Sequence, residues 1–94
     1  MAVTRSRSLS LRVSAVIPYS RPSITKTLES LVNQDFPLYE IILVRDPSID
    51  FVPGGFRVIT GRRGDVGYNR ELGTRLAKGD LILWADDDAI FPRD

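Results

Sequence analysis

The chain has 94 residues, 43% of them hydrophobic and 27% charged, and its 13 Lys and Arg residues against 12 Asp and Glu leave a net charge of +1. This composition is typical of one small folded domain, and the near-neutral charge predicts no nucleic-acid partner. The lack of Cys and His excludes disulfides, thiolate or imidazole metal ligands and histidine general bases among these residues. Oxygen must therefore hold any metal ion, which favours Mg²⁺, Mn²⁺ or Ca²⁺.

The first ten residues are rich in Arg and Ser and lack the apolar block of a secretory signal, although their composition is faintly similar to that of a transit peptide. We expect residues 1–10 to form a flexible arm and residues 11–94 to form the domain. No apolar run approaches the roughly 18 residues that a membrane-spanning helix requires. We therefore expect no membrane span and a cytoplasmic chain.

The first half of the domain predicts a strand, a helix and a second strand. Residues 11–18 alternate between apolar and polar and end at Pro18, which cannot donate to a strand ladder. Pro22 suits the first turn of a helix. Residues 41–44 form a continuous apolar run, which is typical of a strand covered on both faces. The apolar face of the helix is predicted to carry Ile24, Leu28, Leu31 and Val32, and Phe36 and Pro37 end it.

The second half predicts a strand at residues 56–60, a helix with Tyr68, Leu72 and Leu76 on one face, and a strand at residues 80–85. The connection over residues 47–55 is shorter than a parallel crossover normally is, which weakens the case for pairing the second and third strands. The order of elements predicts an α/β fold, an open, mostly parallel Rossmann-like sheet of about four strands with two helices. Ligands of such sheets bind beyond the carboxyl ends of the strands.

Three consecutive aspartates, Asp86, Asp87 and Asp88, directly follow the last predicted strand. Carboxylates about 6 Å apart repel by about 2 to 3 kcal/mol per pair at a protein surface, and a cation offsets that cost. If the extended conformation persists, Asp86 and Asp88 point to one side and Asp87 to the other. A solvated acidic turn or a helix cap is the alternative. The position at a strand end favours a divalent-metal and nucleotide site.

Other strand ends carry weaker candidates. Asp46 ends the second strand, where it either accepts hydrogen bonds from a base or ribose or forms a turn before Pro47. Tyr19 follows the first strand and either offers a ring face to a nucleobase or packs in the core. Residues 61–67 lead into a helix, which suggests phosphate recognition with Arg support or a plain flexible loop.

Five segments, taken together, resemble the family-2 glycosyltransferases in their order and spacing. The resemblance covers residues 11–94 and implies the N-terminal, nucleotide-sugar-binding half of the GT-A fold, a truncated GT-A domain. The segments are residues 13–18, 27–31, 40–46, 67–73 and 77–88.

The resemblance implies roles for five residues and none for Asp87. Asp86 is expected to contact the ribose, and Asp88 to hold a divalent cation, Mn²⁺ or Mg²⁺, that is bound to the diphosphate of a nucleotide-diphospho-sugar. Base contacts are implied for Asp46 and Tyr19, and Arg70 is expected near the base or the phosphate. The chain departs from the family pattern where Arg45 stands in place of the first of two acids and Pro47 in place of a Gly.

The family continues beyond the position of Asp94 into an acceptor-binding half with the catalytic base of an inverting displacement. We therefore expect no catalytic residue among these 94 and, if the polypeptide ends at Asp94, donor binding with little or no transfer. Three hypotheses follow: the donor-binding region of an inverting glycosyltransferase, a non-catalytic nucleotide- or cation-binding module, or a structural α/β fragment. The sugar, the base and the acceptor are not determined.

Overall fold

The computed structural model describes residues 11–35 and 37–92. The arm predicted at residues 1–10 and the helix break predicted at Phe36 lie outside these residues. Six elements follow one another along the chain: β1 (Val13–Tyr19), α1 (Ile24–Val32), β2 (Glu40–Arg45), β3 (Arg57–Thr60), α2 (Val66–Leu76) and β4 (Leu81–Trp84).

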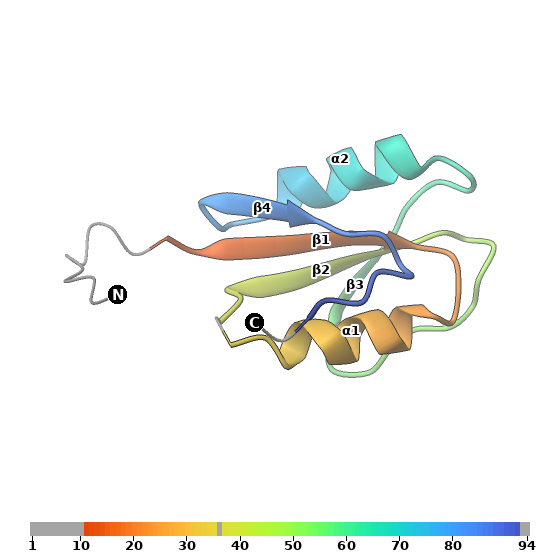
Figure 1. The fold of residues 1–94 in the computed structure, drawn as a ribbon. Coiled ribbons are helices and arrows are strands. Elements are labelled where there is room, and N and C mark those ends of the chain that lie inside the picture. The colour runs from red at the N-terminus through yellow and green to blue at the C-terminus, as the bar shows by residue number, and fades with distance from the viewer. Residues whose placement is uncertain (1–10, 36, 93–94) are drawn as a thin grey trace, which may run out of the picture.

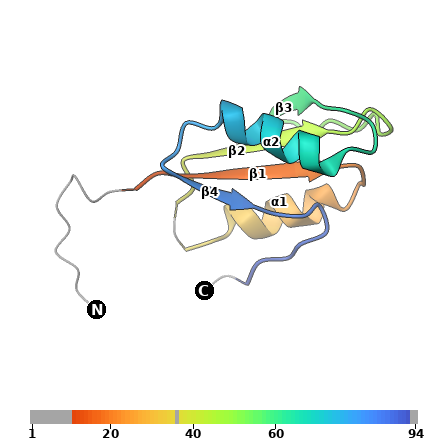
Figure 2. The same cartoon turned by 90° about the horizontal axis from the view of Figure 1, so that it is seen from above.

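The four strands form one parallel sheet in the order β3-β2-β1-β4, with α2 on one face and α1 on the other (Figure 1). The view from above places α2 in front of the strands and α1 behind them (Figure 2). The predicted α/β sheet is therefore confirmed. The chain proceeds from β1 to β2 and β3 and then returns to β4 on the other side of β1. This reversal of order opens a crevice beyond the carboxyl ends of β1 and β4.

Strand β1 is buried on both faces because its alternate side chains meet different helices. Ala15, Ile17 and Tyr19 belong to the core cluster that packs against α1. On the other face, Val16 lies so close to α2 that a Cβ added to Gly73 would stand 2.4 Å from its Cγ1. The residues of α1 in this cluster are Ile24, Leu28 and Leu31, whereas Val32, predicted on the same apolar face, is 58% exposed at the last position of the helix.

The connection between β2 and β3 contains no helix, yet the two strands pair in parallel. The short connection argued against pairing β2 with β3, and the structure shows that they pair nevertheless. Side-chain hydrogen bonds fasten the connecting loop instead: the Arg45 Nη1 donates to the Ile49 carbonyl at 2.6 Å, and the Tyr19 hydroxyl donates to the Phe51 carbonyl at 2.6 Å. Ile49 and Phe56 pack against the core cluster. The loop therefore covers the sheet as a crossover helix would.

Candidate functional site

A cavity of about 250 Å³ opens where the carboxyl ends of β1, β2 and β4 meet. Parallel strands place their carboxyl ends at one edge of the sheet, which brings together side chains far apart in sequence. Four of the five predicted site residues line this cavity, and Arg70 joins them through Asp86. The lining residues are Pro18, Tyr19, Ser20, Arg21, Asp46, Val66, Asn69, Asp86, Asp87 and Asp88.

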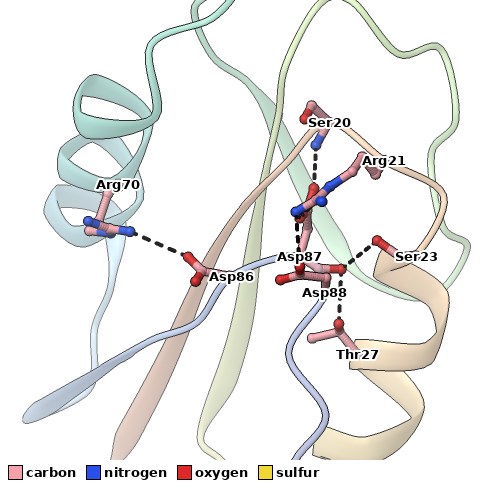
Figure 3. A network of polar contacts seen from close by, with 8 residues as sticks. All are labelled: Ser20, Arg21, Ser23, Thr27, Arg70, Asp86, Asp87 and Asp88. Atoms are coloured by element: carbon pink, nitrogen blue, oxygen red, sulfur yellow. Dashed lines mark hydrogen bonds and ion pairs between the residues drawn. The ribbon is translucent and has the colours of Figure 1, made fainter.

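Asp86 points toward α2, where the Arg70 Nη2 lies 3.8 Å from its Oδ1 (Figure 3). The Asp86 side chain is 73% exposed, so its oxygens remain accessible from the cavity. The Arg70 guanidinium also lies 5.8 Å from the ring centroid of Trp84, and its buried Nε has no hydrogen-bond partner among the residues described. Helix α2 thus places the Arg70 guanidinium beside a carboxylate that follows β4, and the role expected for Arg70 near a base or phosphate stays a prediction.

Asp87 turns the other way and is buried beneath the loop between β1 and α1. Its carboxylate accepts hydrogen bonds from the Ser20 N–H at 2.9 Å, from the Arg21 Nε at 3.0 Å and from the Arg21 Nη2. Its carbonyl accepts from the Ser23 hydroxyl at 2.9 Å and the Thr27 hydroxyl at 3.0 Å (Figure 3). The residue without a predicted role is therefore the most firmly held of the three aspartates.

Asp88 is exposed, with its Oδ2 at 3.5 Å from the Arg21 Nη2. The chain turns here, because the Ala89 N–H donates to the Asp86 carbonyl at 3.2 Å and β4 has already ended at Trp84. The extended conformation on which the predicted alternation of side chains depended therefore does not continue through the three aspartates. The hydrogen bonds that draw Asp87 toward α1 account for the turn.

Asp46 ends β2 with both carboxylate oxygens engaged. The Gly64 N–H donates to its Oδ2 at 2.8 Å, and the Ser48 N–H donates to its Oδ1 at 2.8 Å. These two backbone donors hold the pKa of Asp46 below its ordinary value. The bond to Ser48 is the turn that the sequence offered as the alternative, and the same carboxylate also lines the cavity.

Tyr19 lies in the core cluster and is only 2% exposed. Its hydroxyl donates to the Phe51 carbonyl, and burial raises its pKa. This is the packing alternative of the sequence prediction. Tyr19 also borders the cavity, so its predicted contact with a base stays a prediction.

The loop before α2 is held from within the protein. Asp65 caps the helix by accepting from the Tyr68 N–H at 3.0 Å. The buried Asn69 accepts from the Arg62 N–H at 2.7 Å and donates to the Arg62 carbonyl at 2.9 Å. A Cβ at Gly61 would stand 2.1 Å from the Asn69 Oδ1, so glycine is required there. The Asp65 carboxylate already occupies the start of α2. The loop is therefore a less favourable site for a phosphate than the sequence suggested.

The donor atoms at the cavity suit a cation that is shared with a ligand. Within residues 11–35 and 37–92, no group of three or more His, Cys, Asp or Glu side chains could hold a metal ion alone. Asp88 presents an exposed carboxylate. Mg²⁺ and Mn²⁺ are commonly bound by one or two carboxylates together with phosphate oxygens and water. The exposed Asp88 carboxylate thus suits a cation whose other ligands come from a bound molecule, and the described residues form no cage of protein ligands alone.

Among the described residues, no helix is long and apolar enough to cross a membrane.

The family described as Glycosyl transferase family 2 matches residues 14–94. The chain belongs to this family. The resemblance inferred from its sequence is thus confirmed, and its sheet matches part of a GT-A glycosyltransferase fold. No curated protein matches the chain.

Solved glycosyltransferase structures share this fold. The crystal structure of S. aureus TarS is 26% identical over 88% of this chain, with a TM-score of 0.76. TarS 1–349 in complex with UDP-GlcNAc is 27% identical over 82% of the chain, with a TM-score of 0.64. The mannosyltransferase PcManGT from Pyrobaculum calidifontis, in complex with GDP-Man and Mn²⁺, is 22% identical over 87%, with a TM-score of 0.68. This family-2 chain spans 18%, 26% and 29% of those three chains.

The sequence assigned no individual role at this site to Arg21, Asp87 or Asn69. A signal for Arg21 existed, since a cation directly after the first strand must lie near acids that end a neighbouring strand. The hydroxyls of Ser23 and Thr27 gave a weaker signal, because they are four residues apart and share a face of α1. Asn69 had no comparable signal in its sequence neighbourhood.

Proposed function

We propose that this chain is the donor-binding region of an inverting glycosyltransferase and that it binds a nucleotide-diphospho-sugar in the cavity together with a divalent cation. The observation that carries the proposal is the convergence of Asp46, Asp86 and Asp88 with Arg21 on one cavity of a family-2 chain. Such a pocket offers carboxylates to the hydroxyls of a ligand and to a cation.

Each predicted residue has a part in this proposal. Asp88 would hold Mn²⁺ or Mg²⁺, and the cation would supply Lewis-acid stabilisation of the leaving diphosphate. Asp86 accepts a hydrogen bond from a ribose hydroxyl, with Arg70 beside it at 3.8 Å. Asp46 offers its remaining lone pairs to the base, and Tyr19 borders the same part of the cavity. We assign no catalytic residue within this chain.

Two nucleotides are natural probes because structures similar to this chain hold UDP-GlcNAc and GDP-Man. The test compares thermal unfolding of the chain alone, with Mn²⁺, and with Mn²⁺ plus either UDP or GDP. A ligand that binds only the folded state at about 100 times its Kd stabilises that state by about 2.7 kcal/mol. We expect a rise in the unfolding midpoint of several degrees for one of the two nucleotides.

Asp88→Asn should abolish the Mn²⁺-dependent part of that rise, because an amide lacks the charge that holds the cation. Glu29→Gln, at an exposed position on α1, is the matched control and should leave the rise intact. A midpoint that neither nucleotide moves would overturn the proposal. A full Mn²⁺-dependent rise in Asp88→Asn would leave nucleotide binding standing but place the cation elsewhere.

A further inference from the structure

Asp87, the middle residue of the acidic run, differs from Asp86 and Asp88 in the exposure of its side chain and in its hydrogen bonds. The side chains of Asp86 and Asp88 are 73% and 58% exposed, whereas that of Asp87 is 5% exposed. A buried carboxylate is costly unless charge and hydrogen bonds compensate it. Hydrogen bonds from Ser20 and Arg21, 67 and 66 residues earlier in the chain, compensate the Asp87 carboxylate.

Arg21 forms ion pairs with both Asp87 and Asp88. Its Nε and Nη2 both donate to the Asp87 Oδ1, and its Nη2 lies 3.5 Å from the Asp88 Oδ2. One guanidinium therefore reduces the repulsion between two adjacent carboxylates. It also ties the residue between Asp86 and Asp88 to the loop that follows β1.

From this geometry we propose that Asp87, gripped by Arg21, is a positioning residue. It holds Asp86 toward Arg70 and Asp88 toward the cavity, so that the ribose acceptor and the cation ligand stand apart at set positions. The role of these positions in ligand binding rests on the proposed function. Neither Asp87 nor Arg21 is required to touch the nucleotide or the cation.

The path of the chain does not depend on the Asp87 carboxylate alone. The Asp87 carbonyl is held by Ser23 and Thr27. Farther along, the Ser30 hydroxyl accepts from the Phe91 N–H at 3.1 Å, and the Gln34 amide donates to the Pro92 carbonyl at 2.6 Å. The polar side of α1, together with Gln34 just after the helix, thus anchors the segment after β4 independently of the Asp87 carboxylate. Loss of the Arg21–Asp87 contact should loosen Asp86 and Asp88 while the fold persists.

The experiment uses Arg21→Lys, which keeps the charge but removes the two-pronged contact, and Asp87→Asn, which keeps the shape but removes the charge. Arg12→Lys is the matched control. Arg12 lies just before β1, at the end opposite to Arg21, and forms an exposed ion pair with Asp80. Binding of Mn²⁺ in the presence of UDP, or of GDP, is measured by calorimetry well below the unfolding midpoint. Residues that support metal ligands typically change affinity by about 10- to 100-fold. We expect at least a tenfold weaker Kd in both variants and no change in Arg12→Lys.

A second measurement needs no ligand. Backbone ¹⁵N relaxation should show greater mobility at Asp86 and Asp88 in Arg21→Lys than in the wild type, with the core strands unchanged. Wild-type mobility and affinity in both variants would overturn the positioning role. Weaker affinity with unchanged mobility would also overturn it, because Arg21 would then contact the ligand directly. If the wild type binds neither nucleotide but the variants still loosen Asp86 and Asp88, the proposed function fails and the positioning role stands.

Discussion

Asp46 shows how one side chain serves structure and site together. Its two oxygens fasten the turn after β2 to the loop before α2, through the Ser48 and Gly64 N–H groups, while its carboxylate borders the cavity. Sequence position placed Asp46 at a strand end and therefore near the ligand crevice. Its partners were not predictable, because Gly64 is eighteen residues away and meets Asp46 only when β3 lies beside β2.

Asp46→Asn should lower the free energy of unfolding by about 1 to 2 kcal/mol. The amide keeps one acceptor oxygen and turns a donor toward a backbone N–H, so one charge-assisted bond is lost. Urea denaturation measures the change. Asp50→Asn, at an exposed position in the same loop, is the control and should change the free energy by less than about 0.5 kcal/mol. Equal stabilities of wild type and Asp46→Asn would show that the two backbone bonds contribute nothing.

Within the aspartate run, the positions of Asp86 and Asp88 were predictable from the sequence, whereas the contacts of Asp87 were not. Strand-end position predicted that Asp86 and Asp88 lie at the site, and both line the cavity. The same reasoning gave Asp87 no role, because its partners Ser20 and Arg21 belong to another strand and loop. The residues next to Asp87 in the sequence do not indicate such a long-range contact.

At the scale of elements, helix α2 approaches the sheet through a residue without a side chain. A Cβ at Gly73 would stand 2.4 Å from the Val16 Cγ1 and 3.1 Å from the Val44 Cγ2. A Cβ at Gly67, in the same helix, would meet only the Asp65 Oδ1, at 4.0 Å. The two glycines of α2 therefore differ in packing while sharing one helical backbone.

Gly73→Ala should lower the free energy of unfolding by about 1 to 3 kcal/mol, because the methyl group forces α2 away from β1 and β2. Gly67→Ala should raise it by up to about 1 kcal/mol, since alanine loses less backbone entropy in a helix. Chemical denaturation of both variants checks the pair. Equal effects of the two substitutions would contradict the close packing of α2 on the sheet.

The elements themselves were largely predictable from periodicity. The structure confirms four strands and two helices close to the predicted bounds, because apolar spacing distinguishes strand from helix within a single segment. The pairing of β2 with β3 was harder, since a short connection without a helix argued against it. The bonds from Arg45 and Tyr19 that fasten this connection exist only in the folded chain.

Over the whole molecule, carboxylates tie the strands at both ends of the sheet. At the end opposite the cavity, Glu40 accepts from the Ser14 hydroxyl at 2.6 Å and the Lys78 N–H at 2.5 Å, linking β1, β2 and the turn before β4. Burial raises the pKa of Glu40, but hydrogen bonds from Lys78 and Ser14 outweigh it, so its pKa lies below the ordinary value. The Arg12 N–H and guanidinium likewise lower the pKa of Asp80.

These shifts predict that acid destabilises the fold. A carboxyl group whose pKa is lower in the folded chain stabilises it fully above its ordinary pKa and loses that contribution as the pH falls toward the folded pKa. The free energy of unfolding should therefore be steady near neutral pH. It should fall below about pH 4.5, the ordinary pKa of Glu40, and more steeply below 3.8, that of Asp46 and Asp80.

Urea denaturation between pH 3 and 7 measures this dependence. Glu40→Gln should flatten the part of the fall that begins near pH 4.5, because the amide does not titrate. Glu29→Gln, exposed on α1, is the control and should follow the wild-type curve. A stability that rises as the pH falls would contradict the hydrogen bonding at both ends of the sheet.

Three properties of this protein follow from its amino-acid sequence alone: the α/β class, the strand-end positions of Asp46, Asp86 and Asp88, and the likeness to family-2 glycosyltransferases. These properties depend on local periodicity and on the order of segments along the chain. Three others are visible only in the folded chain: Asp87 is buried against Arg21, the chain turns within the aspartate run, and β2 pairs with β3 without a helix between them. Each of these depends on contacts between segments far apart in sequence, which form when parallel strands bring their carboxyl ends to one edge.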